Sequence, residues 1–327
     1  MSPSPQPPVT HRVVSAPAGR IHLVEMGSGP LVLFVHGFPE SWYSWRHQLP
    51  AVAEAGYRAV AIDVRGYGRS SKPAERDAYR IGALAADNHA VVTALGEETA
   101  VVVGHDWGAP IATASALSYP ETFRAVGLLS VPYAPPADIK LTEALAPLAR
   151  GGEFYLDYFQ RPGRAEAEIE PDVRGWLAGF YTALAADGMA DPGRPDPFTI
   201  PPGARMRDRF PTGPLPDWLS EADLDRYAAE FERTGLTGGL NRYRAMDHDG
   251  QDLREHHGAP LVQPSLFIGG SLDGPTRWFG EAIAAFPTTM PALTASHVLD
   301  GCGHWVQQER PKETNALLLD WLAALPS

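Results

Sequence analysis

The first half of the chain contains short, continuous apolar runs separated by segments with a different pattern. Apolar runs of this length are typical of strands that are buried on both faces of a parallel sheet. Four such runs occur, at 31–35, 57–62, 100–103 and 125–129. Before them, apolar residues at 13–14 and 21–24 flank the turn-forming residues 17–19. This predicts two further short strands near the start.

Segments with helical spacing lie between these runs, at 81–95 and 107–119. Strands that alternate with helices form βαβ units, whose crossover connections are right-handed. The alternation stops after about Pro135 and resumes with apolar runs at 265–268 and 296–299. Residues 315–325 then have the pattern of a final amphipathic helix. We therefore expect an α/β protein with a mostly parallel sheet, helices on both faces and an insertion.

The insertion, residues 136–258, carries helical and loop signals and no convincing strand. Ser220 is a suitable N-cap for a helix that runs to Arg233, with Asp223 at the capping-box position. Residues 187–216 are dense in Pro, Gly and Arg and predict an irregular segment. The sequence thus divides into a disordered tail at 1–10, a core made of 11–135 and 259–327, and an all-helical lid at 136–258.

Charge and composition narrow the range of partners. The 327 residues have a formal net charge of -12, which repels phosphate backbones and disfavours nucleic acid as a partner. No apolar stretch reaches the ~18 residues of a membrane span. The first eight residues, MSPSPQPP, lack the features of a secretory signal. We expect a cytoplasmic protein, and a homo-oligomer is compatible with the sequence.

The strongest chemical signal is the pentapeptide Gly104–His105–Asp106–Trp107–Gly108. It follows an apolar run and opens a helical segment, which is the context of a nucleophile elbow. The flanking glycines allow the strained backbone that exposes the central side chain. That side chain is a carboxylate, which is ionised at neutral pH without a base. A carboxylate at this position is suited to displace a leaving group at a saturated carbon, leaving an ester that water hydrolyses.

The base for that hydrolysis is expected late in the chain. His304 lies on the glycine-rich loop 301–305 after an apolar run, in agreement with the chain order nucleophile, acid, histidine. Asp273, just after the run 265–268, is the predicted partner that orients His304. Asp300 is the alternative, although its place at a strand end favours a role in a turn. Cys302, the one cysteine, is expected to be a small buried neighbour.

A further loop, His36–Gly37–Phe38–Pro39, follows the first buried run. The backbone N–H of Phe38, together with that of Trp107, is expected to form an oxyanion hole. His36 and His105 are assigned structural roles. The histidines at 47, 248, 256 and 257 lie in stretches that suggest exposure to solvent.

These segments resemble the epoxide hydrolases of the α/β-hydrolase fold family. The resemblance covers nearly all of the chain after about His11, is specific in the core and is weaker in the lid. It is carried by HGFPESWYSWRHQLPA (36–51), AIDVRGYGRSS (61–71), GHDWGAP (104–110) and DGCGHWVQQERP (300–311). The resemblance implies conversion of a small hydrophobic epoxide and water to a vicinal diol, with neither a cofactor nor a metal.

The resemblance also implies two lid tyrosines that protonate the epoxide oxygen, because an alkoxide is a poor leaving group. The segment EFYLDYFQRPG (153–163) maps the first to Tyr155, with Tyr158 as the alternative about one helical turn later. The segment GLNRYR (239–244) maps the second to Tyr243. Arg242 departs from the family, which usually has Trp there, so the pocket wall is expected to differ.

Other functions fit parts of this pattern. A haloalkane or haloacid dehalogenase also uses an aspartate nucleophile, but it gives the two tyrosines no role. A non-catalytic receptor on a hydrolase scaffold would not need the set Asp106, Asp273 and His304. The cluster Asp247–His248–Asp249 looks like a metal site, but its polar surroundings favour solvated side chains.

Overall fold

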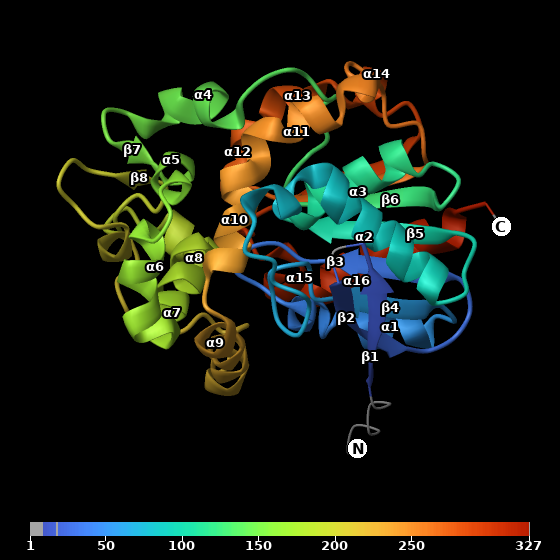
Figure 1. Cartoon of the computed structure of the whole chain (residues 1–327), viewed down its shortest axis with the longest axis horizontal. Coiled ribbons are helices and arrows are strands. Elements are labelled where there is room, and N and C mark those ends of the chain that lie inside the picture. The colour runs from blue at the N-terminus through green and yellow to red at the C-terminus, as the bar shows by residue number, and fades with distance from the viewer. Residues whose placement is uncertain (1–8, 18, 327) are drawn as a thin grey trace.

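A central sheet of eight strands forms the core of the protein (Figure 1). The computed structural model describes residues 9–17 and 19–326. In spatial order the sheet runs β1-β2-β4-β3-β5-β6-β9-β10. The bounds are β1 (Thr10–Ala16), β2 (Gly19–Met26), β3 (Leu31–Val35), β4 (Arg58–Ile62), β5 (Ala100–His105), β6 (Phe123–Leu129), β9 (Ser265–Gly270) and β10 (Leu293–Leu299).

The sheet is parallel from β4 to β10, and β1 and β2 add an antiparallel edge. In the register of β3 and β5, Val35 pairs with Gly104, so the loops after both strands start at the same edge of the sheet. In open parallel sheets this carboxyl edge is where binding sites form. The predicted mostly parallel α/β sheet is confirmed.

Alternate residues of the strands enter two separate apolar cores, one on each face of the sheet. Leu31 and Leu33 of β3 pack in one core, whereas Val32 and Phe34 pack in the other. The first core includes residues of α2 (Ile81–Ala94) and α3 (Gly108–Ser118). The second includes residues of α1 (Gln48–Glu54) and α16 (Pro311–Ala324). Burial on both faces explains why the strands are apolar without alternation.

The insertion supplies mainly helices, which Figure 1 shows largely to one side of the sheet. They are α4 (Leu141–Leu145), α5 (Tyr155–Gln160), α6 (Arg164–Ile169), α7 (Val173–Leu184), α8 (Ala186–Ala190), α9 (Glu221–Thr234), α10 (Thr237–Ala245) and α11 (Asp249–Asp252). The lid also contains a two-stranded sheet, β7 (Glu153–Phe154) with β8 (Thr199–Ile200). The prediction of a lid without strands was therefore wrong, because a strand of two residues is too short to show a period.

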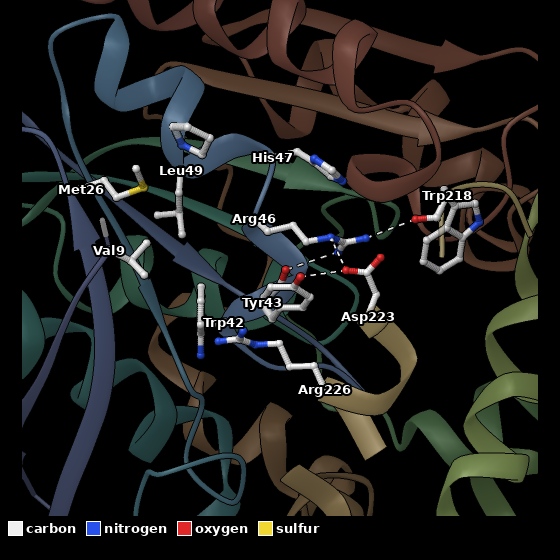
Figure 2. Close-up of a pocket in the computed structure, with 11 residues that line it drawn as sticks. Val9, Met26, Trp42, Tyr43, Arg46, His47, Leu49, Trp218, Asp223 and Arg226 are labelled. Atoms are coloured by element: carbon white, nitrogen blue, oxygen red, sulfur yellow. Dashed lines mark hydrogen bonds and ion pairs between the residues drawn. The ribbon is translucent and has the colours of Figure 1, made fainter. Parts of the chain in front are cut away.

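Hydrogen bonds tie the lid to the core. The Tyr181 hydroxyl of α7 donates to the carbonyl oxygen of Pro39 over 2.6 Å. The Tyr43 hydroxyl of the core donates to Asp223 of α9 over 2.8 Å, and Arg46 lies 3.4 Å from the same carboxylate (Figure 2). Asp223 also completes the predicted capping box with Ser220. The lid is thus fixed on top of the sheet edge that carries the loops.

One boundary and one segment differ from the sequence predictions. Thr10 belongs to β1, so a tail that includes residue 10 is wrong. The irregular segment 187–216 contains part of α8 and the strand β8. The rest of the predicted tail, 1–8, and residue 18 of the predicted turn lie outside the described residues. The domain division at 135/136 and 258/259 stays a prediction.

The chain returns to the core after the lid. Between β9 and β10 lie α12 (Gly274–Trp278), α13 (Gly280–Ala284) and α14 (Phe286–Thr289), and α15 (Val306–Glu309) precedes α16. In the part of the chain that the structure describes, no helix is both long and apolar enough to cross a membrane.

Candidate active site

Asp106 occupies the sharp turn between β5 and α3. Its φ of 51° lies in the left-handed region, which is unusual for a non-glycine residue and costs about 1–3 kcal/mol. A Cβ at Gly104 would lie 2.0 Å from the Gly108 carbonyl oxygen, and one at Gly108 would lie 2.0 Å from that of Val35. Glycine is therefore required on both sides of the turn. The geometry is that of the predicted nucleophile elbow.

The loop after β3 reaches the Asp106 carboxylate. The Phe38 N–H donates to Oδ1 of Asp106 over 2.8 Å. A Cβ at Gly37 would lie 2.1 Å from the same oxygen, so this approach needs glycine. Trp107 is the N-cap residue of α3, so its backbone N–H lies at the start of that helix. Of the two predicted oxyanion-hole donors, Phe38 thus already contacts the carboxylate.

His304 and Asp273 come together in a buried pair. Nδ1 of His304 lies 2.8 Å from Oδ1 of Asp273, which is fully buried. Ser130 and Thr276 each donate a hydroxyl hydrogen bond to the other oxygen of Asp273, over 2.7 and 2.8 Å. Asp300 is exposed and accepts a hydrogen bond from Ser271, in agreement with a role in a turn. The geometry favours Asp273 as the partner of His304.

His304 also faces Asp106, since its Nε2 lies 3.6 Å from Oδ2 of that residue. Burial lowers the pKa of His304, but the charges and hydrogen bonds of Asp273 and Asp106 outweigh this effect and raise the pKa to about 10. While both carboxylates are ionised, His304 is therefore protonated at neutral pH. Loss of the negative charge on Asp106 would remove its share of the effect that raises the pKa of His304.

A second buried histidine lies behind His304. His105 contacts the His304 carbonyl oxygen through Nε2 over 2.8 Å and Glu40 through Nδ1 over 2.9 Å. The charge of His105 helps to keep the pKa of Glu40 at about 2 despite burial, so this carboxylate is ionised. The two contacts hold the His105 ring between the Glu40 carboxylate and the backbone of His304. Sequence reasoning gave His105 a structural role but missed its partner Glu40.

His36 is buried as a neutral ring. Its Nδ1 donates to the Gly37 carbonyl oxygen over 2.7 Å, and its Nε2 accepts from the Val64 N–H over 3.0 Å. Burial lowers the pKa of His36, which favours this neutral form. Through these two bonds His36 fixes the loop that carries the Phe38 N–H.

Tyr155 and Tyr243 line one small cavity with Asp106 and His304. The two tyrosine rings lie 6.1 Å apart, centroid to centroid. Burial and the charge of Asp106 raise the pKa of each hydroxyl above its usual range, so both stay protonated. Tyr158 instead donates to Glu168. Of the two alternatives in α5, the geometry favours Tyr155.

Two cavities adjoin Asp106. One of about 240 Å³ is lined largely by apolar side chains, and the smaller one, of about 30 Å³, contains His304 and the two tyrosines. A larger hollow of about 530 Å³ lies by Tyr43, Arg46 and Asp223 (Figure 2). None of the predicted catalytic residues lines that hollow. We therefore place the candidate site at Asp106.

Arg242 is buried behind the site. Its guanidinium lies 4.5 Å from the centroid of the Trp107 ring, donates to the Tyr79 carbonyl oxygen over 3.0 Å and pairs with Asp249. Arg242 lines neither cavity at Asp106, so it supports the wall through Trp107 and does not form its surface. The interpretation of 247–249 as solvated is wrong for two residues, since Asp249 binds Arg242 and Asp247 accepts from Thr142 over 2.6 Å.

Cys302 is fully buried, as predicted, and burial raises the pKa of its thiol. Of the four histidines predicted to be exposed, His257 is exposed, whereas His47, His248 and His256 are half-buried. Among residues 9–17 and 19–326, no group of three or more His, Cys, Asp or Glu side chains is arranged to hold a metal ion.

The chain is similar in sequence to known proteins over nearly its full length. A family model described as "alpha/beta hydrolase fold" matches residues 30–168. Epoxide hydrolase B of Mycobacterium tuberculosis is 43% identical over 96% of this chain and 98% of the relative. Epoxide hydrolase A of the same organism is 42% identical over 97% of this chain and 98% of the relative.

Solved structures agree with these sequence matches. An epoxide hydrolase from an endophytic Streptomyces is 66% identical, with a TM-score of 0.93 over 96% of this chain and 95% of that one. Epoxide hydrolase A from Mycobacterium thermoresistibile is 42% identical, with a TM-score of 0.90 over 98% of this chain and 99% of that one. With a parallel sheet, an aspartate at the elbow and these relatives, the chain belongs to the epoxide hydrolases of the α/β-hydrolase fold family.

Proposed function

We propose that the protein hydrolyses small hydrophobic epoxides to vicinal diols through a covalent ester on Asp106. One observation carries this proposal. The elbow residue is a carboxylate, and a single cavity joins it to His304 and to the hydroxyl-bearing residues Tyr155 and Tyr243. An ionised carboxylate is a nucleophile without a base, and two protonated tyrosines can supply the proton that a strained ether oxygen needs.

In the first step, an Asp106 carboxylate oxygen attacks a ring carbon and forms an ester bond. The bond between that carbon and the epoxide oxygen breaks, and the oxygen takes a proton from Tyr155 or Tyr243, leaving a tyrosinate. The charge of Asp106 raises the pKa of both hydroxyls, so this proton transfer becomes easier as that charge is lost to the ester. Attack and proton donation therefore assist each other.

Formation of the ester also prepares the base. His304 has a pKa of about 10 while both neighbouring carboxylates are charged. Esterification of Asp106 removes one of those charges, which lowers the pKa of His304 and allows it to release its proton to solvent. His304 takes a proton from solvent again once the Asp106 carboxylate is restored. Asp273 remains to orient the neutral imidazole with Nε2 free. On this proposal, the enzyme does not need a neutral base before substrate has reacted.

In the second step, Nε2 of His304 takes a proton from water, and the hydroxide attacks the Asp106 carbonyl carbon. The N–H groups of Phe38 and Trp107 stabilise the resulting oxyanion. The 2.8 Å bond from Phe38 to Oδ1 supports this role. The ester C–O bond then breaks, the leaving diol oxygen takes the proton from His304, and the new Asp106 carboxylic acid returns its proton to the tyrosinate.

A single-turnover reaction in oxygen-18 water tests this proposal. Excess enzyme and styrene oxide are mixed, and the diol is analysed by mass spectrometry. An unlabelled diol is expected, because its new oxygen comes from Asp106. A labelled diol would mean direct attack by water and would exclude the ester. The absence of diol, with release of halide from a haloalkane, would favour the dehalogenase.

A cytoplasmic location stays a prediction of the sequence, and a homo-oligomer stays compatible with it.

A further inference from the structure

The two cavities at Asp106 meet at a common wall and differ greatly in size. Asp106, Tyr155 and Pro275 line both of them. One has a volume of about 240 Å³ and the other about 30 Å³. The proposed nucleophile and one proposed proton donor therefore stand between a large space and a small one.

The larger cavity is apolar and reaches the protein surface. Its walls include Leu141 and Leu145 of α4 and Trp278 of α12. Ile139 also lines it, and the side chain of Ile139 is 61% exposed. Apolar walls favour an apolar substituent by about 25 cal/mol per Å² of surface removed from water. This cavity offers both a route of entry and a binding site for a bulky group.

The smaller cavity is lined mainly by side chains of the lid. Phe180 and Leu184 of α7, together with Met206 and Phe210, are buried members of this lining. Its volume, about 30 Å³, is about one eighth of that of the larger cavity. His304 lines only this cavity, so the water that it activates needs the same space.

Attack on an epoxide fixes how the substrate must lie. The attacking carboxylate oxygen, the ring carbon and the departing oxygen must be nearly in line for reaction. With Asp106 at one end and the tyrosine hydroxyls at the epoxide oxygen, the substituents of the two ring carbons extend sideways. The spaces next to Asp106 and Tyr155 that are available to these substituents are the large cavity and the small one.

We infer that this enzyme selects epoxides with one bulky apolar substituent and only a hydrogen or a methyl group on the other ring carbon. The inference rests on the proposed function. The selection is steric, because side chains such as Met206 and Phe210 occupy the volume that a second bulky group would need. Close-packed interiors resist such insertion, since neighbouring side chains must leave their preferred rotamers.

Three aryl epoxides test the inference with the intact protein. Styrene oxide has one phenyl group, trans-β-methylstyrene oxide has a phenyl and a methyl group, and trans-stilbene oxide has two phenyl groups. We expect diol from the first two and a kcat/KM at least about 100-fold lower for trans-stilbene oxide. Equal kcat/KM values for all three would overturn the size selection. Diol from none of them would instead overturn the proposed function.

Variants of the cavity walls then test which cavity causes the selection by size. Met206→Ala enlarges the small cavity and is expected to raise kcat/KM for trans-stilbene oxide, relative to styrene oxide, at least about tenfold. Leu145→Ala removes similar bulk from the large cavity and is the matched control, with no such gain expected. Leu184→Ala gives a second test on the small cavity if Met206→Ala does not fold. A gain with Leu145→Ala but with neither small-cavity variant would contradict the assignment.

Discussion

The imidazole of His304 lies between two carboxylates, with Nδ1 2.8 Å from Asp273 and Nε2 3.6 Å from Asp106. Asp273 is fully buried and receives further hydrogen bonds, whereas Asp106 faces the cavities. Of the two carboxylates, only Asp106 can therefore contact a substrate. Asp273 forms no bond to the substrate in the proposed reaction, whereas the charge of Asp106 is lost if its carboxylate forms an ester.

Replacing His304 by Gln should separate the two proposed steps. The ester forms without the base, but its hydrolysis should fall by at least about 1000-fold. Intact-protein mass spectrometry after incubation with styrene oxide should therefore find the protein heavier by one substrate molecule. The double variant Asp106→Ala/His304→Gln is the control and should remain unmodified. An adduct on the double variant would mean that the ester is on another residue.

The raised pKa of His304 predicts a dependence of stability on pH. The folded protein keeps the His304 proton up to pH about 10, whereas the unfolded chain loses it near the ordinary value of 6.5. Between these values the folded state binds more protons, so the free energy of unfolding falls as pH rises. The contribution of His304 is complete below pH 6.5 and is lost as pH approaches about 10.

Urea unfolding at pH 7, 8 and 9 measures this effect. The free energy of unfolding of the wild type should fall more steeply with pH than that of His304→Gln. The difference in slope can reach about 1.4 kcal/mol per pH unit, which corresponds to one proton. Identical slopes for the two proteins would mean that His304 is neutral in the folded free enzyme.

The lid tyrosines should affect the first step, not the second. Tyr155→Phe and Tyr243→Phe each remove one proton donor, and each should slow ester formation by about 10- to 100-fold, with a larger loss in the double variant. Stopped-flow measurement of a single turnover reports this rate. Tyr158→Phe is the matched control, because this residue lies on the same helix and bonds to Glu168. A loss with Tyr158→Phe as large as with Tyr155→Phe would contradict the assignment of Tyr155.

The pair Arg242–Asp249 should contribute to stability through its burial. The Arg242 side chain is only 3% exposed, so removing Asp249 leaves a buried charge without its partner. Asp249→Asn should lower the free energy of unfolding by about 3 kcal/mol. The double variant Arg242→Met/Asp249→Asn should cost less than the sum of the two single changes, because no charge is then left unpaired.

An exposed ion pair provides the control. Arg12 pairs with Glu25 at 3.1 Å, and its side chain is 41% exposed. Arg12→Met should cost less than about 1 kcal/mol, because solvent screens the pair. If Asp249→Asn cost no more than Arg12→Met, the interaction at Arg242 would be no stronger than one at the surface.

The local pattern of residues was sufficient to predict most of the sheet strands, the elbow at Asp106 and the helix capped by Ser220. The strand Leu31–Val35 has the predicted bounds, and the helix after Ser220 begins and ends within one residue of the prediction. These features depend on residues that are close in sequence: apolar runs for strands, glycines around Asp106 for the turn, and a side-chain cap for the helix. The fragments β7 and β8 were missed, because their pairing joins residues almost 50 positions apart and leaves no local signal.

The sequence by itself therefore determined the α/β core, the carboxylate at the elbow and the candidates for its partners. Only the tertiary structure decided which candidates meet: Tyr155 at the cavity and Tyr158 at Glu168, Asp273 against His304 and Asp300 at the surface. It also decided the environment of Glu40 and the sizes of the two cavities. The physical reason is that proximity, burial and pKa arise from segments far apart in the chain, whose contacts no local pattern of residues encodes.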